Sequence, residues 1–310
     1  MIGTIKVNKW PISRPAAALA SIGARGRSPL KDFWDLTKPR MNFLVLVTTM
    51  VGYYMAARGW GEWGRFTSTL LGTALTAAGA SVLNQAMERE FDALMRRTAN
   101  RPLPAGRVRP IEAWIFGAAL SAGGIAVLAV FVNLLTALLG AITLAIYLFL
   151  YTPAKRHTTL CTIIGAVPGA LPAMVGFTAA DGAITAPALA VFAILFVWQM
   201  PHFLSIAILC RDDYARGGFR MLPVLDESLD VSTRQILLYS LTLIPVSLFP
   251  VALQMAGWIY FAAAVVLSLV FCGFGLVCAK TKSRADARQL FFASIVYLPC
   301  LLAAMTIDNL

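Results

Sequence analysis

The sequence predicts an all-helical protein that crosses a membrane many times. Of its 310 residues, 59% are hydrophobic and only 13% are charged, whereas a soluble domain carries about 25% charged residues. Too few polar side chains remain to coat a water-soluble globule of this size. The apolar surface is therefore expected to face lipid.

Nine stretches are apolar and long enough to cross a bilayer core of about 30 Å, which takes about 20 helical residues. They lie at 42–58, 66–87, 112–131, 134–151, 160–180, 186–209, 235–254, 258–279 and 289–307. We therefore expect one nine-helix domain over residues 42–310. Residues 1–41 are interpreted as a basic cytoplasmic tail, partly disordered, although the acid-free first 31 residues also resemble a transit peptide.

The basic residues lie almost entirely on one side of these spans. The tail and the alternate connections hold 24 of the 26 Lys and Arg residues, and the other connections hold only Arg58 and Arg65. This positive-inside pattern places the N-terminus in the cytoplasm and the C-terminus outside. No basic stripe with interleaved aromatic residues lies on a soluble domain, so the net charge of +11 indicates a lipid bilayer, and not nucleic acid, as the partner.

The second span ends in a cluster of polar residues. Asn84, Glu88 and Asp92 are four residues apart and share one helix face. Three oxygen ligands on one face suit a hard cation such as Mg²⁺, although a solvated helix end explains the same pattern. Arg97 and Arg101 follow directly. Such arginines often serve only as topology signals, but beside a carboxylate cluster they predict a diphosphate site.

A second polar cluster, Arg211 to Tyr214, follows the sixth span on the same side of the membrane. Its two acids, Asp212 and Asp213, either face the first cluster across a cavity or decorate a charged helix end. His202 lies about two turns inside the sixth span. A lone histidine in an apolar helix is usually hydrogen-bonded and structural, yet polar groups at membrane depth are candidates for function.

These residues resemble the UbiA-type intramembrane prenyltransferases, whose signature is N-x-x-x-D/E-x-x-x-D on the second helix and an acidic motif after the sixth. Within that superfamily the chain is most similar to the branch that farnesylates haem. The matching stretches are Thr37–Arg40, Asn84–Asp92, Arg97–Pro104, Trp198–Phe203, Asp213–Tyr214 and Met221–Val224. The second D-x-x-x-D of the superfamily is incomplete, because Arg216 and Gly217 stand four residues after the two acids.

The resemblance implies a bundle around a central cavity, with Mg²⁺ as cofactor and farnesyl diphosphate and haem B as substrates. It implies that Mg²⁺ and diphosphate are held by Asn84, Glu88, Asp92 and Asp213. The implied substrate contacts are Arg97, Arg101, Lys155, Arg211, Asp212, Tyr214 and, on haem, His202. The product would be haem O for haem-copper oxidases, with a haem A synthase or oxidase assembly proteins as partners. A bacterial inner membrane is the expected location, with the mitochondrial inner membrane as the alternative.

Two other functions are alternatives to this one. A sister prenyltransferase acting on an aromatic acid in quinone biosynthesis would share the metal site, but Trp198–Phe203 and Asp213–Tyr214 argue against it. A secondary transporter would carry ionisable residues near the bilayer midplane. In this sequence the acids fall at span ends and in connections.

Overall fold

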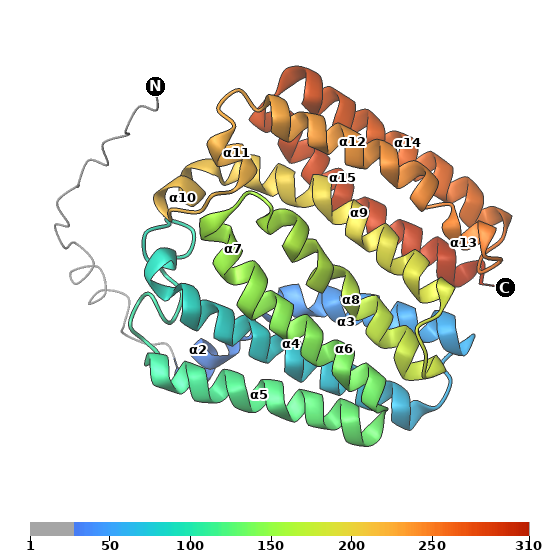
Figure 1. The fold of residues 1–310 in the computed structure, drawn as a ribbon, viewed down its shortest axis with the longest axis horizontal. Helices are drawn as coiled ribbons and strands as arrows, with labels where there is room; N and C mark the ends of the chain where they lie inside the picture. The colour runs from blue at the N-terminus through green and yellow to red at the C-terminus, as the bar shows by residue number, and fades with distance from the viewer. Residues whose placement is uncertain (1–27, 310) are drawn as a thin grey trace.

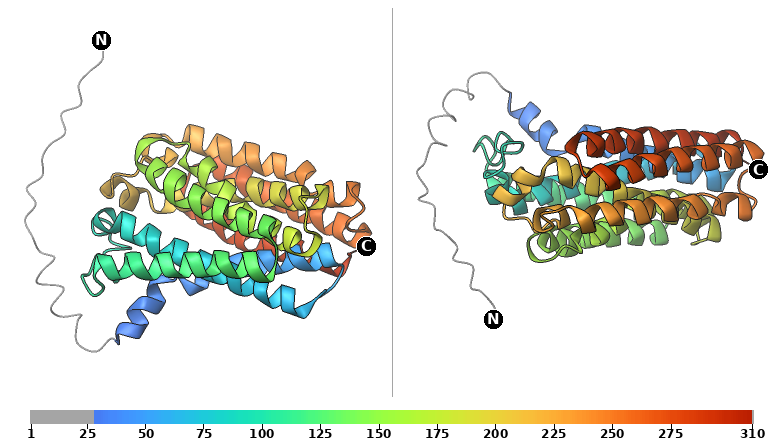
Figure 2. Two further views of the ribbon diagram at one scale, coloured as in Figure 1. Left: turned by 60° about the horizontal axis from the view of Figure 1, so that its bottom comes forward. Right: turned by 90° about the horizontal axis from the view of Figure 1, so that it is seen from above.

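The structure, a computed structural model, describes residues 28–309 as a bundle of long helices (Figures 1 and 2). Its elements are α2 (Pro29–Leu36), α3 (Pro39–Ala57), α4 (Trp63–Asp92), α5 (Pro110–Phe131), α6 (Leu134–Ala145), a π-helix η1 (Ile146–Tyr151), α7 (Thr152–His157), α8 (Cys161–Asp181), α9 (Ala186–Leu209), α10 (Arg211–Arg216), α11 (Leu222–Leu225), α12 (Asp230–Val246), α13 (Phe249–Ala252), α14 (Trp258–Thr281) and α15 (Arg284–Ile307). Most of the predicted tail, residues 1–27, lies outside the described residues. Its last part is helical, because α2 begins at Pro29 and α3 at Pro39.

Eight helical segments of the described chain are long and apolar enough to cross a membrane. They correspond to the second to ninth predicted spans, with α6, η1 and α7 forming one segment and α12 with α13 another. The first predicted span, 42–58, is present as the 19-residue helix α3. Arg40 and Asn42 in its first turn reduce its apolarity. The fold thus supports eight membrane spans, and α3 does not meet the same criterion.

Several helices begin at residues whose chemistry favours a start. The side chain of Asn133 accepts the N–H of Thr136 at 2.8 Å ahead of α6, and Ser283 accepts the N–H of Asp286 at 3.0 Å ahead of α15. Proline occupies the first turn of α2, α3, α5 and α9, where its missing N–H costs no helical hydrogen bond. These caps satisfy backbone groups that lipid cannot.

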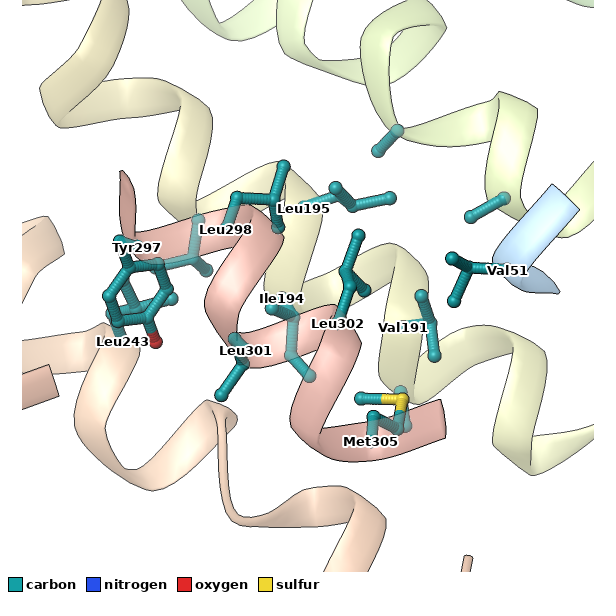
Figure 3. Packing of buried hydrophobic residues seen from close by; sticks show 14 of the residues in the cluster. Val51, Val191, Ile194, Leu195, Leu243, Tyr297, Leu298, Leu301, Leu302 and Met305 are labelled. Carbon is teal, nitrogen blue, oxygen red and sulfur yellow. The ribbon is translucent and has the colours of Figure 1, made fainter. Parts of the chain in front are cut away.

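Helices α8 and α9 form the centre of the bundle. In the most apolar window of α8, 72% of residues are buried, against 22% for α5, so α5 turns most of its apolar surface outward to lipid. The largest buried cluster joins residues of α3, α8, α9, α12, α14 and α15. Figure 3 shows its contact between α9 and α15, made by Val191, Ile194, Leu195, Leu298, Leu301, Leu302 and Met305.

The polar connections gather at one end of the bundle. In Figure 1, α2, α10, α11 and the loop after α4 lie at the left, and the C-terminus lies at the opposite end. An ion pair of 2.9 Å between Arg107 Nε and Asp32 Oδ1 ties that loop to α2. The end that holds most basic residues is therefore also the end where the functional candidates meet.

A central cavity, expected from the resemblance, is not confirmed. One cavity of about 520 Å³ lies between α14 and α15. Another of about 250 Å³ is lined by Arg58, Asp181 and Gln254 at the opposite end of the bundle from the polar connections. Neither is lined by Glu88 or Asp92, which are paired with Lys155 and Arg101.

Helices α4 and α5 approach each other through glycine. A Cβ placed on Gly124 of α5 would lie 2.6 Å from the carbonyl oxygen of Gly72 and 2.4 Å from Thr76 Oγ1, both on α4. Contacts this short leave room for hydrogen alone. Small residues are the usual means by which membrane helices pack their backbones closely.

The adjacent glycines of α5 give a matched test of this packing. We expect Gly124→Ala to destabilise the protein by about 1–3 kcal/mol, because α4 must move away from the added methyl group. Gly123 has nothing within 4 Å of its would-be Cβ, so Gly123→Ala should leave stability unchanged or raise it by up to about 1 kcal/mol through helix propensity. Thermal unfolding in detergent measures both. Equal effects of the two substitutions would contradict the close approach.

Candidate functional site

The last three turns of α4 carry three buried polar side chains on one face. Asn84, Glu88 and Asp92 are 2%, 6% and 1% exposed, so the alternative of a solvated helix end does not describe them. The predicted four-residue spacing does place them together. Buried groups of this kind require hydrogen-bonding or charged partners.

Each of the three has a specific partner. Glu88 Oε1 lies 2.7 Å from Lys155 Nζ, and Asp92 Oδ2 lies 2.6 Å from Arg101 Nη1. The Asn84 amide donates to Thr152 Oγ1 at 3.0 Å, which leaves its carbonyl oxygen free for another ligand. Both acids are thus held as charge-balanced pairs at the end of the bundle.

A π-helical turn places the partners that come from the fourth span. η1 (Ile146–Tyr151) interrupts the helix immediately before Pro153, whose ring cannot donate a helical hydrogen bond. The wider turn shifts Thr152 and Lys155 against α4. Thr152 Oγ1 donates to the carbonyl of Tyr147 at 2.8 Å, and the Lys155 ammonium lies 4.5 Å from the centre of the Tyr151 ring. Hydropathy alone gives no signal for this turn.

The loop that follows α4 folds back over the site. Thr98 Oγ1 donates to the carbonyl of Asp92 at 2.7 Å, which turns Arg101 toward the Asp92 carboxylate. Arg107 spans from Asp32 on α2 to the carbonyl of Asn100, with an Nη2–O distance of 2.9 Å. The predicted contact Arg101 is therefore in the site, and the loop is braced by α2.

Lys38 is a site residue that was not among the predicted contacts, although it lies in the Thr37–Arg40 motif. It occupies the corner between α2 and α3 in the left-handed region, with φ of 49°, a strained conformation for a residue other than glycine. Burial of its ammonium, together with the charges of Arg101 and Lys155, lowers its pKa to about 7, while Glu88 and Asp92 oppose that shift. The surroundings of Lys38 thus disfavour its charged form.

Hydrogen bonds hold this corner in place. The Gln85 amide, on α4, donates to the carbonyl of Leu36 at 2.7 Å. The Asn42 amide donates to the carbonyl of Thr37 at 2.6 Å. A positive φ and hydrogen bonds of this kind cannot be read from a single sequence. The sequence signal at this corner is limited to a basic residue beside a proline.

The second acidic cluster is divided by the structure. Asp213 accepts the backbone N–H of Arg96 at 3.1 Å and pairs with Arg216. Partial burial alone would raise the pKa of Asp213, but these hydrogen bonds outweigh that effect and lower the pKa. Among residues 28–309 no three His, Cys, Asp or Glu side chains converge as a metal site. Asp213 thus contacts the loop after α4, through the N–H of Arg96, in addition to its own Arg216.

The neighbours of Asp213 have different surroundings. Asp212 points outward with 66% of its side chain exposed and pairs with Arg284 at 3.1 Å. Arg211 donates to the backbone carbonyls of Glu227 and Asp226 at 3.3 and 3.4 Å. These two predicted contacts are engaged in holding α10 to the segments around it, outside the α4 site.

Aromatic residues form the wall between the two clusters. The Arg97 guanidinium lies 6.0 Å from the centre of the Tyr214 ring, which makes an edge contact with Phe219 at 6.0 Å. Phe219 is in turn 5.9 Å from Lys155 Nζ. Burial raises the pKa of Tyr214, so its hydroxyl stays protonated. Arg97 and Tyr214 thus stand at the rim of the site. His202 lies apart, on α9 against α15.

The arrangement suits a ligand that brings a cation and an anion together. Asn84, Glu88 and Asp92 offer only oxygen, the donor that hard divalent cations prefer. Lys155 and Arg101 offer the positive charge that phosphate oxygens need. Such a ligand would let every charged group exchange its present partner for a new one.

Comparison with known proteins agrees with this geometry. The profile of the UbiA prenyltransferase family matches residues 45–296. The protoheme IX farnesyltransferase of Solibacter usitatus is 45% identical over 289 residues, covering 90% of this chain and 99% of that protein. That of Aquifex aeolicus is 40% identical over 91% of this chain and 97% of its own length.

Solved structures show the same fold at low sequence identity. A structure of digeranylgeranylglyceryl phosphate synthase aligns with a TM-score of 0.77 at 16% identity, covering 90% of this chain and 98% of its own. A UbiA homolog from Archaeoglobus fulgidus bound to GPP and Mg²⁺ aligns with a TM-score of 0.60 at 17% identity, covering 88% and 99%.

The pairing of Glu88 with Lys155 predicts the outcome of a double substitution. Lys155→Met should destabilise the protein by about 3–5 kcal/mol, because it leaves a buried carboxylate without its cation. Lys155→Met combined with Glu88→Gln should recover most of that loss. Thermal unfolding of the three proteins measures this coupling. Arg109→Met, which removes an exposed pair with Glu112, is the control and should change little. Additive effects of the two buried substitutions would contradict the pair.

Proposed function

Because this chain belongs to the UbiA prenyltransferase family, we propose that it transfers a farnesyl group from farnesyl diphosphate to haem B, giving haem O. The protein is a multi-pass membrane prenyltransferase. The acceptor is supported by relatives named protoheme IX farnesyltransferase, which this chain matches over nearly their whole length.

The observation that carries the proposal is the pair of buried acids on α4, each matched to a cation. Asn84, Glu88 and Asp92 would hold Mg²⁺, and Lys155 and Arg101 would turn from these acids to the diphosphate oxygens. Structures of an archaeal homolog bound to GPP and to DMAPP with Mg²⁺ support this choice of metal and ligand. Mg²⁺ bound there would neutralise charge on the leaving diphosphate.

The chain's own residues favour departure of the diphosphate. As the allylic C–O bond breaks, its electron pair goes to the diphosphate, and preorganised cations stabilise that charge. A haem vinyl group then attacks the farnesyl cation to form a C–C bond. Water adds to the resulting cation and loses a proton, which gives a hydroxyethylfarnesyl group. Apolar side chains around the site limit water to this last step.

The remaining predicted residues would act around this centre. Arg97 and Tyr214 would guide the diphosphate at the rim. Asp213 would complete the metal site, and its hydrogen bond to the N–H of Arg96 would position the loop after α4.

The protein would lie in a bacterial inner membrane, and the relatives named above come from bacteria. With α3 as a ninth span, the N-terminus and the site face the cytoplasm and the C-terminus faces the periplasm. Farnesyl diphosphate would then reach the site from the side where its charged end is soluble. The product would pass to a haem A synthase or to oxidase assembly proteins.

Two acids two residues apart on α4 test the metal site. Asp92→Asn should lower turnover at least about 100-fold, because it removes a charged ligand of the metal that neutralises the diphosphate, while leaving the protein folded. Glu90 is exposed and, among residues 28–309, pairs with Arg89 alone, so Glu90→Gln should retain activity. Purified proteins are incubated with haem B, farnesyl diphosphate and Mg²⁺. The mass of the extracted haem is then measured by mass spectrometry, to detect the addition of a farnesyl group plus water. Chelation of Mg²⁺ should stop wild-type turnover, and added Mg²⁺ should restore it. Equal activity of both variants would refute the site.

The low pKa of Lys38 predicts how diphosphate binding depends on pH. Only the protonated ammonium attracts diphosphate, and above a pKa of about 7 its population falls tenfold per pH unit. Affinity for farnesyl diphosphate should therefore weaken by up to about tenfold per unit above pH 7, until the pKa raised by bound diphosphate is passed.

Lys38→Arg is the matched protein for this measurement, because arginine stays charged over the whole range. The affinity of Lys38→Arg for farnesyl diphosphate should not fall with pH as that of the wild type does. The diphosphate titrates in the same way in both measurements, so the ratio of the two affinities removes its contribution. Lys31→Arg, at an exposed position, should follow the wild type. Parallel profiles for wild type and Lys38→Arg would show that this ammonium does not contact the diphosphate.

A further inference from the structure

His202 is held in one orientation between two helices. Its ring on α9 stacks between Trp198, with ring centres 4.9 Å apart, and Phe291 of α15, at 5.2 Å. Its Nδ1 lies 2.7 Å from Ser294 Oγ. The Trp198 indole N–H donates to the carbonyl of Ser294 at 3.0 Å, which anchors the stack to the same turn of α15.

The hydrogen bonds of Ser294 determine which nitrogen of His202 carries the proton. Ser294 Oγ lies 2.6 Å from the carbonyl oxygen of Phe291. Two oxygens at this distance need a proton between them, and only the hydroxyl has one to give. Ser294 Oγ must then accept at its other contact, so His202 Nδ1 is the donor. In the neutral ring the lone pair therefore resides on Nε2.

Among residues 28–309 that lone pair has no hydrogen-bond partner. The buried side-chain atoms that lack partners in this range are the hydroxyls of Thr73 and Ser121, so Nε2 retains access to the surroundings of the bundle. An acceptor without a partner is unfavourable in a bilayer, and this favours a ligand that binds to it.

His202 is also at a suitable depth. It lies seven residues, about 10 Å, before the end of α9 at Leu209, and Glu88 lies four residues, about 6 Å, before the end of α4. The segments following the two helices touch, since Asp213 accepts the N–H of Arg96. His202 and the diphosphate site therefore belong to the same end of the bundle.

We propose that Nε2 of His202 ligates the iron of the haem substrate, with Ser294 fixing the tautomer that makes this possible. The inference rests on the proposed function, because it takes haem as the acceptor. A neutral imidazole whose other nitrogen donates to a fixed acceptor is the usual arrangement of a histidine on a metal. Ligation would position the macrocycle, and the bond-forming chemistry would occur at its edge.

A haem titration of the purified full-length protein tests the inference without relying on turnover. The chain has only two histidines, so His157→Ala is a matched control. Wild type and His157→Ala should show the same shift of the haem absorption band on binding. His202→Ala and His202→Gln should lack that shift and bind haem at least about tenfold more weakly. His202→Gln keeps a polar side chain of similar length, and thermal unfolding confirms that both variants fold.

Ser294→Ala separates iron ligation from a merely structural histidine. It should keep the spectrum of the ligated haem but weaken binding by about tenfold, because Nδ1–H loses its acceptor. Identical spectra and affinities for wild type and both His202 variants would overturn the inference.

A parallel incubation with farnesyl diphosphate distinguishes this inference from the proposed function. If wild type farnesylates haem while the His202 variants bind it with an unchanged spectrum, only the ligation is wrong. If wild type shows the His202-dependent spectrum but never farnesylates haem, the proposed function is wrong and the ligation stands.

Discussion

The balance of charge inside an apolar bundle is the constraint on which this structure depends. An isolated carboxylate in a medium of low polarity is so costly that it would take up a proton. In this structure the nearest cations, Lys155 and Arg101, lie within 2.7 Å of Glu88 and Asp92. The end of α4, the loop that follows it, the segment that carries Lys155 and the corner at Lys38 must therefore meet in one place. The fold at this end of the molecule follows from that requirement.

Each supporting element serves this convergence. The glycine contacts with α5 hold α4 rigidly, which gives its acids a fixed position. The π-helical turn before Pro153 directs Lys155 inward, and the corner at Lys38 adds a third cation at the cost of a strained backbone. The loop after α4 would be free to move without Asp32, whose pair with Arg107 fastens it to α2. These contacts together hold the acids and their cations at this end of the bundle.

Much of the fold could be predicted from the sequence, because hydropathy and helical periodicity are local properties. The eight apolar spans, the uneven distribution of basic residues and the cluster from Asn84 to Asp92 are all readable in this way. Contacts between distant segments are not. Asp213 and Asp212 look equivalent in the sequence, yet one contacts Arg96 and the other an exposed arginine. The π-helical turn and the tautomer of His202 likewise depend on three-dimensional neighbours.

The two ion pairs on α4 have a consequence for the order of binding. A metal ion arriving alone would take Glu88 and Asp92 from their cations and leave Lys155 and Arg101 as unmatched buried charges. A diphosphate arriving alone would do the reverse. If both bind as proposed, each would create the vacancy that the other fills, and their affinities would be coupled by the same free energy in both directions. Such a site would favour capture of the metal–diphosphate complex as one unit over stepwise loading.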